Sequence, residues 1–331
     1  MILVTGATGL VGGHLLFHLL TENTTVRAIR RKSSQLHGLE LIFASYNADP
    51  KQYLDRIEWV TGDVTDKKSI LEAMNGVSQV FHCAAVVSLG NGSDLLTDTN
   101  VSGTRNVVEA ALQSQVQKFC FVSSIAACGK NTNGKPIDEQ CEWTDAESRS
   151  VYARSKYFSE QEVWKGIRNG LNAVIVNPGV ILGFSGTNSG SAELFYRVRK
   201  GLPFYTNGGS GYVDVKDVVK AMMLLMKSEI SAERFILVAE NCSNKDILSW
   251  IALGFGRMKP VLGLGKPVLL TVGYLSEIAG KVFGFKPLLD RGMARSALNR
   301  EYYSSEKIKK ALGLTFIPIE KTIQDVCRQM Q

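Results

Sequence analysis

A glycine-rich turn near the start of the chain restricts the fold more than any other feature. The apolar run at residues 2–5 leads into TGATGLVG at 5–12, and leucines then recur at helical spacing. This pattern predicts a strand, a tight turn and a helix. Gly6 permits the tight turn, Gly9 lets the main chain approach a ligand closely, and Gly12 allows the helix to pack against the strand.

The same segment predicts that a dinucleotide binds here. The free N–H groups at the start of a helix attract a pyrophosphate, so the turn and first helical residues should contact it. Besides the three glycines, these are Thr8, Leu10 and Val11. A glycine-rich turn without a ligand is the structural alternative.

Further strands and helices alternate along the chain, which indicates a parallel sheet with helices on both faces, a doubly wound α/β fold. Strand patterns cover 24–30, 56–66, 77–85, 117–124 and 171–178, and helical patterns cover 68–76, 100–115 and 151–168. A helix at 213–227 and a strand at 233–240 should rejoin this sheet. We therefore expect a dinucleotide-binding domain at 1–178 plus 213–240, and a smaller, mostly helical substrate-binding lobe at 179–212 plus 241–331.

Charge and composition exclude several functions. The net charge of +7 arises from 38 basic and 31 acidic residues spread along the chain, which favours an anionic ligand over nucleic acid. Six cysteines without a CxxC pair indicate reduced thiols, and His14 and His18 lack a third ligand for a metal. The start of the chain lacks the pattern of a secretory signal, so we expect a cytoplasmic protein.

The most lipophilic segment, at 268–285, is interrupted by Glu277 and Lys281. We expect an amphipathic helix that covers a pocket and not a transmembrane span, with a peripheral membrane contact as the alternative.

Cofactor choice is indicated where the second strand ends. An Asp or Glu there would bind the adenosine 2′-hydroxyl, but this chain has Arg30, Arg31 and Lys32. Because a guanidinium binds a 2′-phosphate well, NADP(H) is the expected cofactor and NAD(H) the alternative. A solvated basic loop would be the structural alternative. Asp63 and Val64 should border the adenine, and Cys83, Ala84 and Ala85 should let the dinucleotide pass closely.

Tyr152 precedes Lys156 by four residues in a helical segment, so both side chains share one face. A nearby cation favours the phenolate, so we expect Lys156 to lower the pKa of Tyr152 and to make it a proton donor or acceptor. Ser124 ends the fifth strand and could polarise a substrate carbonyl. Parallel strands bring these groups to one sheet edge.

Taken together, these motifs resemble the extended, epimerase-like branch of the short-chain dehydrogenase/reductase superfamily, over essentially the whole chain. The matching residues are TGATGLVG, Asp63-Val64, Cys83-Ala84-Ala85, Asn100, Ser123-Ser124, Tyr152-x-x-x-Lys156, Asn177-Pro178-Gly179 and YVDVKDV. Ser124 is preferred over Ser123 because it lies five residues before Gly129, where the family places its catalytic Ser or Thr.

The resemblance implies roles for these residues. Tyr152 acts as the general acid or base, and Lys156 also binds the nicotinamide ribose. Pro178, Gly179 and Val180 would lie beside the nicotinamide, and Val122 would be a further cofactor-binding residue. Asn100 either joins a proton relay or caps the helix at 100–115. Helices 100–115 and 152–168 would pair in a homodimer.

Departures from the family patterns bear on the reaction. Ile125 and Ala126 follow Ser124, where dehydratases place Asp-Glu, and Ser210-Gly211 replace the substrate-binding arginine of sugar-nucleotide epimerases. The apolar segment at 266–289 resembles dihydroflavonol reductases and 3β-hydroxysteroid dehydrogenases. We expect an NADP(H)-dependent oxidoreductase that interconverts a ketone and a secondary alcohol on a hydrophobic molecule. The alternatives are a nucleotide-sugar epimerase and a non-catalytic NADP(H)-binding regulatory protein.

Overall fold

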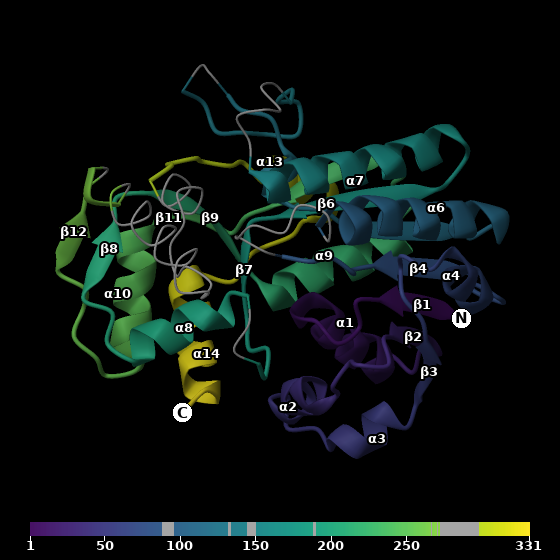
Figure 1. Cartoon of the computed structure of the whole chain (residues 1–331), viewed down its shortest axis with the longest axis horizontal. Helices are drawn as coiled ribbons and strands as arrows, with labels where there is room; N and C mark the ends of the chain where they lie inside the picture. Colours follow the sequence, from purple (N-terminus) through teal and green to yellow (C-terminus); the bar gives the residue numbers. More distant parts are fainter. Residues whose placement is uncertain are drawn as a thin grey trace.

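The computed structural model describes residues 1–87, 96–131, 134–143, 150–187, 190–265, 267–269, 271 and 298–331. Its centre is a sheet of seven parallel strands in the order β10-β6-β5-β4-β1-β2-β3 (Figure 1). These strands are β1 (Ile2–Thr5), β2 (Val26–Arg30), β3 (Ile57–Thr61), β4 (Gln79–His82), β5 (Lys118–Val122), β6 (Ala173–Pro178) and β10 (Glu233–Leu237). The expected doubly wound fold is confirmed, and the late strand does rejoin the sheet beside β6.

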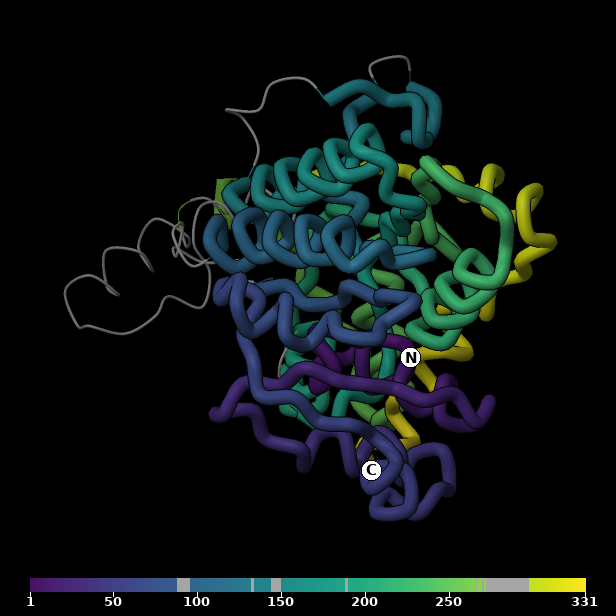
Figure 2. Tube along the Cα trace, turned by 90° about the vertical axis from the view of Figure 1, so that its right-hand side faces the viewer, coloured from purple at the N-terminus to yellow at the C-terminus, as the bar shows by residue number. Residues whose placement is uncertain are grey.

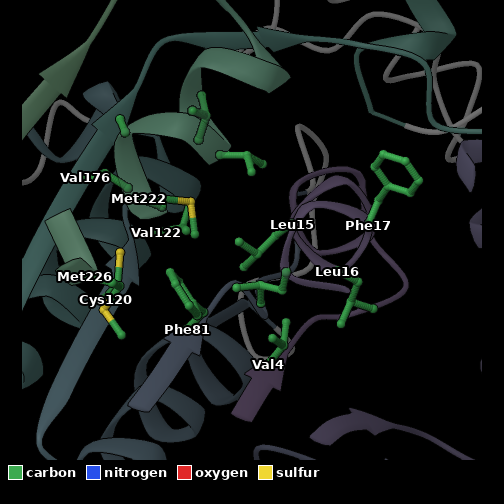
Figure 3. Packing of buried hydrophobic residues seen from close by; sticks show 14 of the residues in the cluster. Val4, Leu15, Leu16, Phe17, Phe81, Cys120, Val122, Val176, Met222 and Met226 are labelled. Carbon is green, nitrogen blue, oxygen red and sulfur yellow. The ribbon is translucent and has the colours of Figure 1, made fainter. Parts of the chain in front are cut away.

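Helices cover both faces of this sheet because its strands are apolar on both sides. Leu3 and Phe121 pack into one buried cluster and their neighbours Val4 and Val122 into the other, as the two-residue period of a strand requires. Figure 3 shows the second cluster, where Met222 lies among strand residues. On that face lie α1 (Leu10–Thr21) and α9 (Val215–Lys227); on the other lie α4 (Lys67–Ala73), α6 (Gly103–Gln113) and α7 (Val151–Arg168).

Local signals place the ends of these helices. Ser150 caps α7 through its Oγ, which accepts from the N–H of Ala153 at 3.1 Å. Asp214 caps α9 by accepting from the N–H of Lys216 at 2.7 Å, so this helix begins at residue 215 and not at 213. A π-helical turn, η1 (Thr97–Ser102), precedes α6, and the two helices α6 and α7 lie side by side (Figure 2). Two short helices that were not predicted, α2 (His37–Ala44) and α3 (Pro50–Leu54), connect β2 to β3, and α3 begins with Asp49 as its N-cap and Pro50 as its first residue.

The second part of the chain forms a lobe that contains small sheets as well as helices (Figure 1). Its core unites Phe195, Ile251 and Ile323 from three helices. Its elements are β7 (Val180–Leu182), α8 (Ala192–Arg199), β8 (Phe204–Thr206), β9 (Gly209–Asp214), β11 (Glu240–Ser243), α10 (Asn244–Gly254), β12 (Leu262–Leu264) and α14 (Ile319–Gln329).

One late helix, α13 (Glu306–Leu312), packs against β10 and α9 and so lies with the large sheet. The division into two domains at the expected boundaries stays a prediction. The expected amphipathic helix at 268–285, with Glu277 and Lys281, falls almost entirely outside the described residues, so its role also stays a prediction. Among the described residues, no helix is long and apolar enough to cross a membrane.

Candidate active site

The glycine turn between β1 and α1 is closed to side chains on two sides. A Cβ on Gly6 would lie 2.5 Å from the main-chain nitrogen of Ala84, and a Cβ on Gly12 would lie 2.2 Å from the carbonyl oxygen of Gly6. Gly6 also has a φ of +68°, which a side chain would disfavour. The spacing therefore reflects real steric limits, as the sequence predicted.

The start of α1 suits an anion. Gly9 is its N-cap residue, no side chain caps it, and no acidic residue occupies its first turn. The N–H groups of Leu10, Val11 and Gly12 thus begin a helix whose positive dipole end faces the turn that contains Thr8. This cradle fits the pyrophosphate of a dinucleotide.

A buried polar chain fastens the turn to the neighbouring strand. Thr5 Oγ1 lies 2.6 Å from His82 Nδ1, and His82 Nε2 lies 3.0 Å from Thr104 Oγ1. Burial lowers the pKa of His82 to about 3, so this ring stays neutral. The N–H of Ala84 donates to Thr5 Oγ1 at 3.3 Å, which sets the path of the Cys83-Ala84-Ala85 segment past Gly6. The sequence carried no signal for this role of His82, because its partners come from distant elements.

Basic and acidic side chains lie where β2 and β3 end. The Arg30 guanidinium lies 5.3 Å from the centre of the Trp59 ring, while Arg31 and Lys32 are exposed. None of these three cations forms an ion pair within the described part of the chain. Asp63 Oδ1 accepts from the hydroxyl of Thr65 at 2.8 Å.

Val64, next to Asp63, is buried: a Cβ on Gly103 would lie 2.7 Å from its Cγ2. Val64 therefore packs against the start of α6, and its expected contact with the adenine stays a prediction.

The structure brings Ser124 and Tyr152 together. Ser124 follows β5, and its side chain lies close enough to the phenol of Tyr152, in the first turn of α7, to lower the pKa of that phenol. The Ser124 Oγ also accepts from the N–H of Ala126 at 3.1 Å, which begins a short 3₁₀ turn, η2 (Ile125–Ala127). The neighbouring Ser123 points elsewhere, donating to Glu160 at 2.8 Å. Of the two serines, it is Ser124 that contacts the tyrosine.

The electrostatic expectation for the tyrosine was wrong. Burial raises the pKa of Tyr152 above its ordinary value, and the hydrogen bond to Ser124 opposes this only in part. The ammonium of Lys156 instead donates to the carbonyl oxygen of Val122 at 2.8 Å, and burial lowers the pKa of Lys156 to about 8. Desolvation therefore sets the direction of the shift, and Tyr152 remains protonated at neutral pH.

Asn100 lies inside η1 and does not cap the helix at 100–115, so that alternative was wrong. Its side chain is buried and holds the main chain of Val86: Oδ1 accepts from the N–H of Val86 at 2.8 Å, and Nδ2 donates to the carbonyl oxygen of Val86 at 3.1 Å. Its Nδ2 also donates to Ser155 Oγ at 3.0 Å, and Ser155 in turn donates to the carbonyl oxygen of Tyr152. Asn100 thus supports the first turn of α7, while its part in a proton relay stays a prediction.

The last expected cofactor segment lies where β6 ends and β7 begins. Pro178 is buried, Gly179 donates its N–H to the carbonyl oxygen of Leu237 at 2.9 Å, and Val180 is partly exposed. A Cβ on Gly179 would lie 2.4 Å from the carbonyl oxygen of Gly211, so only glycine fits. This close crossing joins the sheet to the lobe beside the carboxyl end of β6.

The remaining candidate residues have structural roles. His14 contacts the Tyr46 hydroxyl at 2.6 Å and the carbonyl oxygen of Phe184 at 2.8 Å, and burial lowers its pKa to about 4. No group of three or more potential metal ligands gathers among the described residues. All six cysteines are free thiols.

Comparison with known proteins places this site in a family. The family model described as NAD dependent epimerase/dehydratase matches residues 2–238. The chain belongs to this family. A relative from Synechocystis sp., named "Putative dihydroflavonol 4-reductase", is 30% identical over 99% of this chain and 94% of its own. Sterol demethylase protein B of Methylococcus capsulatus is 31% identical over 83% of this chain and 80% of its own.

Solved structures share the fold of this family member. The crystal structure of gox2253 superimposes with a TM-score of 0.81 at 29% identity, covering 100% of this chain and 97% of that one. UDP-glucose 4-epimerase of Thermus thermophilus, in complex with NAD, gives a TM-score of 0.76 at 21% identity, covering 99% and 98%. This NAD-dependent epimerase/dehydratase family member is therefore an extended short-chain dehydrogenase/reductase, an enzyme that acts on CH–OH groups with NAD(P).

Proposed function

We propose that this enzyme is an NADP(H)-dependent oxidoreductase that interconverts a ketone and a secondary alcohol on a hydrophobic small molecule, with reduction favoured. The observation that carries the proposal is the proximity of the Ser124 and Tyr152 side chains, one helical turn from Lys156, in a chain that also has a turn suited to a pyrophosphate. The phenol of Tyr152 has a proton to give at neutral pH, because its ordinary pKa is already near 10 and burial raises it. A protonated phenol suits a general acid, and reduction of a ketone needs one.

The residues act in a simple order. When bound, the reduced nicotinamide supplies the hydride that the carbonyl carbon gains. The Tyr152 hydroxyl donates its proton to the carbonyl oxygen, which becomes the alcohol oxygen. The Ser124 hydroxyl hydrogen-bonds the same oxygen and orients it, and Lys156 keeps positive charge close to the reacting groups.

The neighbouring residues support reduction over sugar-nucleotide chemistry. Ile125 and Ala126 form an apolar turn after Ser124, where an elimination would need an additional acid and base. Ser210 and Gly211 in β9 supply no cation for a substrate diphosphate. A Cβ on Gly211 would lie 2.6 Å from Val238 Cγ2, so this position is closed to any side chain.

The preference for NADP(H) rests on the cations after β2. Arg30 stacks on Trp59, which holds its guanidinium at the strand end, and Arg31 and Lys32 are free to meet a 2′-phosphate. The relatives named as reductases favour a carbonyl substrate: cinnamoyl-CoA reductase 1 of Petunia hybrida, for example, is 26% identical over 100% of this chain.

A homodimer through α6 and α7 is part of the same proposal. Phe158 on α7 is 47% exposed, which leaves apolar surface for a second copy. Sedimentation at micromolar concentration should show the dimer, and a monomer would contradict it.

Purified enzyme tests the activity directly. NADPH oxidation is followed at 340 nm with aliphatic, aromatic and steroid ketones, and in a parallel reaction the enzyme is incubated with a UDP-sugar. Turnover of at least one ketone, lost in Tyr152→Phe, is expected. Epimerisation of the UDP-sugar without turnover of any ketone would overturn the proposal in favour of the epimerase. No turnover of any substrate, with NADPH binding unchanged in Tyr152→Phe, would favour the non-catalytic alternative.

A further inference from the structure

A buried carboxylate lies directly behind the proposed catalytic residues. Glu160 follows Lys156 by one turn of α7, and its side chain is only 1% exposed. One oxygen, Oε2, accepts from Ser123 Oγ at 2.8 Å and from Asn177 Nδ2 at 2.9 Å. The other, Oε1, accepts from Arg234 Nη1 at 3.2 Å and from Trp164 Nε1 at 3.3 Å.

All four partners of this carboxylate are hydrogen-bond donors. Only a group that accepts at both oxygens satisfies them, because a glutamine would turn its NH₂ towards donors on one side. The guanidinium of Arg234 compensates the buried charge, and it is itself held by the carbonyl oxygen of Glu139. The hydrogen bonds of the cluster therefore match a group that accepts at both oxygens, as the Glu160 side chain does.

The same carboxylate holds the end of β5, where the proposed catalytic serine lies. Three consecutive residues there are fixed from outside the strand: Lys156 binds the carbonyl oxygen of Val122, Glu160 binds the hydroxyl of Ser123, and Asn177 binds the carbonyl oxygen of Ser124. Two of these three hydrogen bonds involve Glu160. It accepts directly from Ser123, and it also accepts from the Asn177 Nδ2 that donates to the carbonyl oxygen of Ser124.

The negative charge of Glu160 also raises the pKa of Lys156. His82 and Cys83 approach the ammonium from β4, and Tyr152 and Glu160 share its helix. His82 is neutral, and burial raises the pKa of the Cys83 thiol to about 12, so this thiol is neutral as well. Among these groups Glu160 carries the negative charge that helps Lys156 to keep its proton, and the same carboxylate also pairs with Arg234.

We propose that Glu160 is a positioning residue of this enzyme: its buried carboxylate holds the main chain that presents Ser124. This inference rests on the proposed function for its effect on turnover. It does not require the carboxylate to touch substrate or cofactor.

Glu160→Gln in the full-length chain is the main test. We expect kcat for ketone reduction to fall about 10- to 100-fold, the range of a displaced catalytic group, while the Kd for NADPH changes less than about twofold. Loss of the negative charge should move the alkaline limb of the kcat profile about 1 pH unit lower, because Lys156 then loses its proton more easily. Glu162→Gln on the same helix is the matched control, since its carboxylate pairs at the surface with Arg105.

Two milder variants separate positioning from stability and keep the test decisive if Glu160→Gln does not fold. Ser123→Ala removes a donor from the oxygen near the site, whereas Trp164→Phe removes one from the remote oxygen. We expect kcat to fall about threefold or more in the first, and thermal stability alone to fall in the second. Equal kcat in both variants, or an unchanged kcat and pH profile in Glu160→Gln, would overturn the proposal.

Hydrogen exchange separates this inference from the proposed function. The N–H of Ser123 donates to the carbonyl oxygen of Val176 at 2.8 Å, so exchange at residues 122–127 reports the order of this strand end without turnover. Glu160→Gln should accelerate that exchange about tenfold or more, with no acceleration in Trp164→Phe. If the wild type reduces no ketone, the proposed function fails, and hydrogen exchange alone then decides the role of Glu160. Exchange at residues 122–127 that is the same in Glu160→Gln as in the wild type would refute the positioning role.

Discussion

Replacing Gly12 by alanine should damage the cofactor turn itself. The added Cβ would meet the Gly6 carbonyl oxygen at 2.2 Å, the Gly6 carbonyl carbon at 2.8 Å and Ala7 Cα at 2.9 Å. All three atoms belong to the main chain, so α1 or the turn must move. Overpacking of this kind costs about 3 kcal/mol, and the helix propensity of alanine returns at most about 1 kcal/mol. The expected net loss is about 2 kcal/mol of unfolding free energy.

Gly13→Ala is a matched control on the same helix. Its Cβ would meet Ile42 Cδ1 at 2.8 Å and Leu39 Cδ1 at 3.1 Å, which are ends of flexible side chains. These ends can rotate away, so the gain in helix propensity should leave the stability of this variant within about 0.5 kcal/mol of the wild type.

Urea unfolding and NADPH fluorescence titration measure both effects. With an m-value of about 3 kcal/mol/M, Gly12→Ala should lower the unfolding midpoint by about 0.7 M, and its NADPH affinity should fall about tenfold or more because the turn is displaced. Gly13→Ala should match the wild type in affinity. Equal midpoints and affinities for the two variants would refute the steric reasoning.

Three further predictions concern catalysis, cofactor choice and stability. Tyr152→Phe should lower kcat about 10²- to 10⁴-fold with little change in the NADPH Kd, measured by initial rates and titration; a variant with near-normal kcat would exclude Tyr152 as the acid. Arg30→Gln should weaken NADPH binding about tenfold or more and leave NADH binding within about twofold, whereas equal losses for both would undo the preference for NADP(H). Burial raises the pKa of Asp217 to about 6. The folded state therefore binds this proton more tightly, and wild-type stability is lost as the pH rises from about 4 to about 6. Asp217→Asn cannot ionise, so its stability relative to the wild type should grow by about 2–3 kcal/mol over that interval in urea titrations, and a constant difference would contradict the assigned pKa.

The sequence by itself determined the frame of the fold and the positions of the candidate residues. The alternation of apolar strands with helices specified the parallel sheet, because strands buried on both faces and their crossover helices have distinct periods. The glycine spacing specified the turn for a local reason as well: the positive φ of Gly6 and the contact of Gly12 with the Gly6 carbonyl both arise within the turn, whereas the close approach of Ala84 to Gly6 comes from a distant segment. The 152–156 spacing also placed Tyr152 and Lys156 on one helix.

Only the tertiary structure decided the electrostatics of the site and the partners of its residues. Burial raises the pKa of Tyr152, although its distance in sequence from Lys156 suggested the opposite. Asn100 supports α7 because Ser155 and Val86 come to it from other elements. The cluster around Glu160 likewise unites α7, β6 and β10. Desolvation and long-range hydrogen bonds depend on which segments meet in space, and no local pattern of residues encodes that.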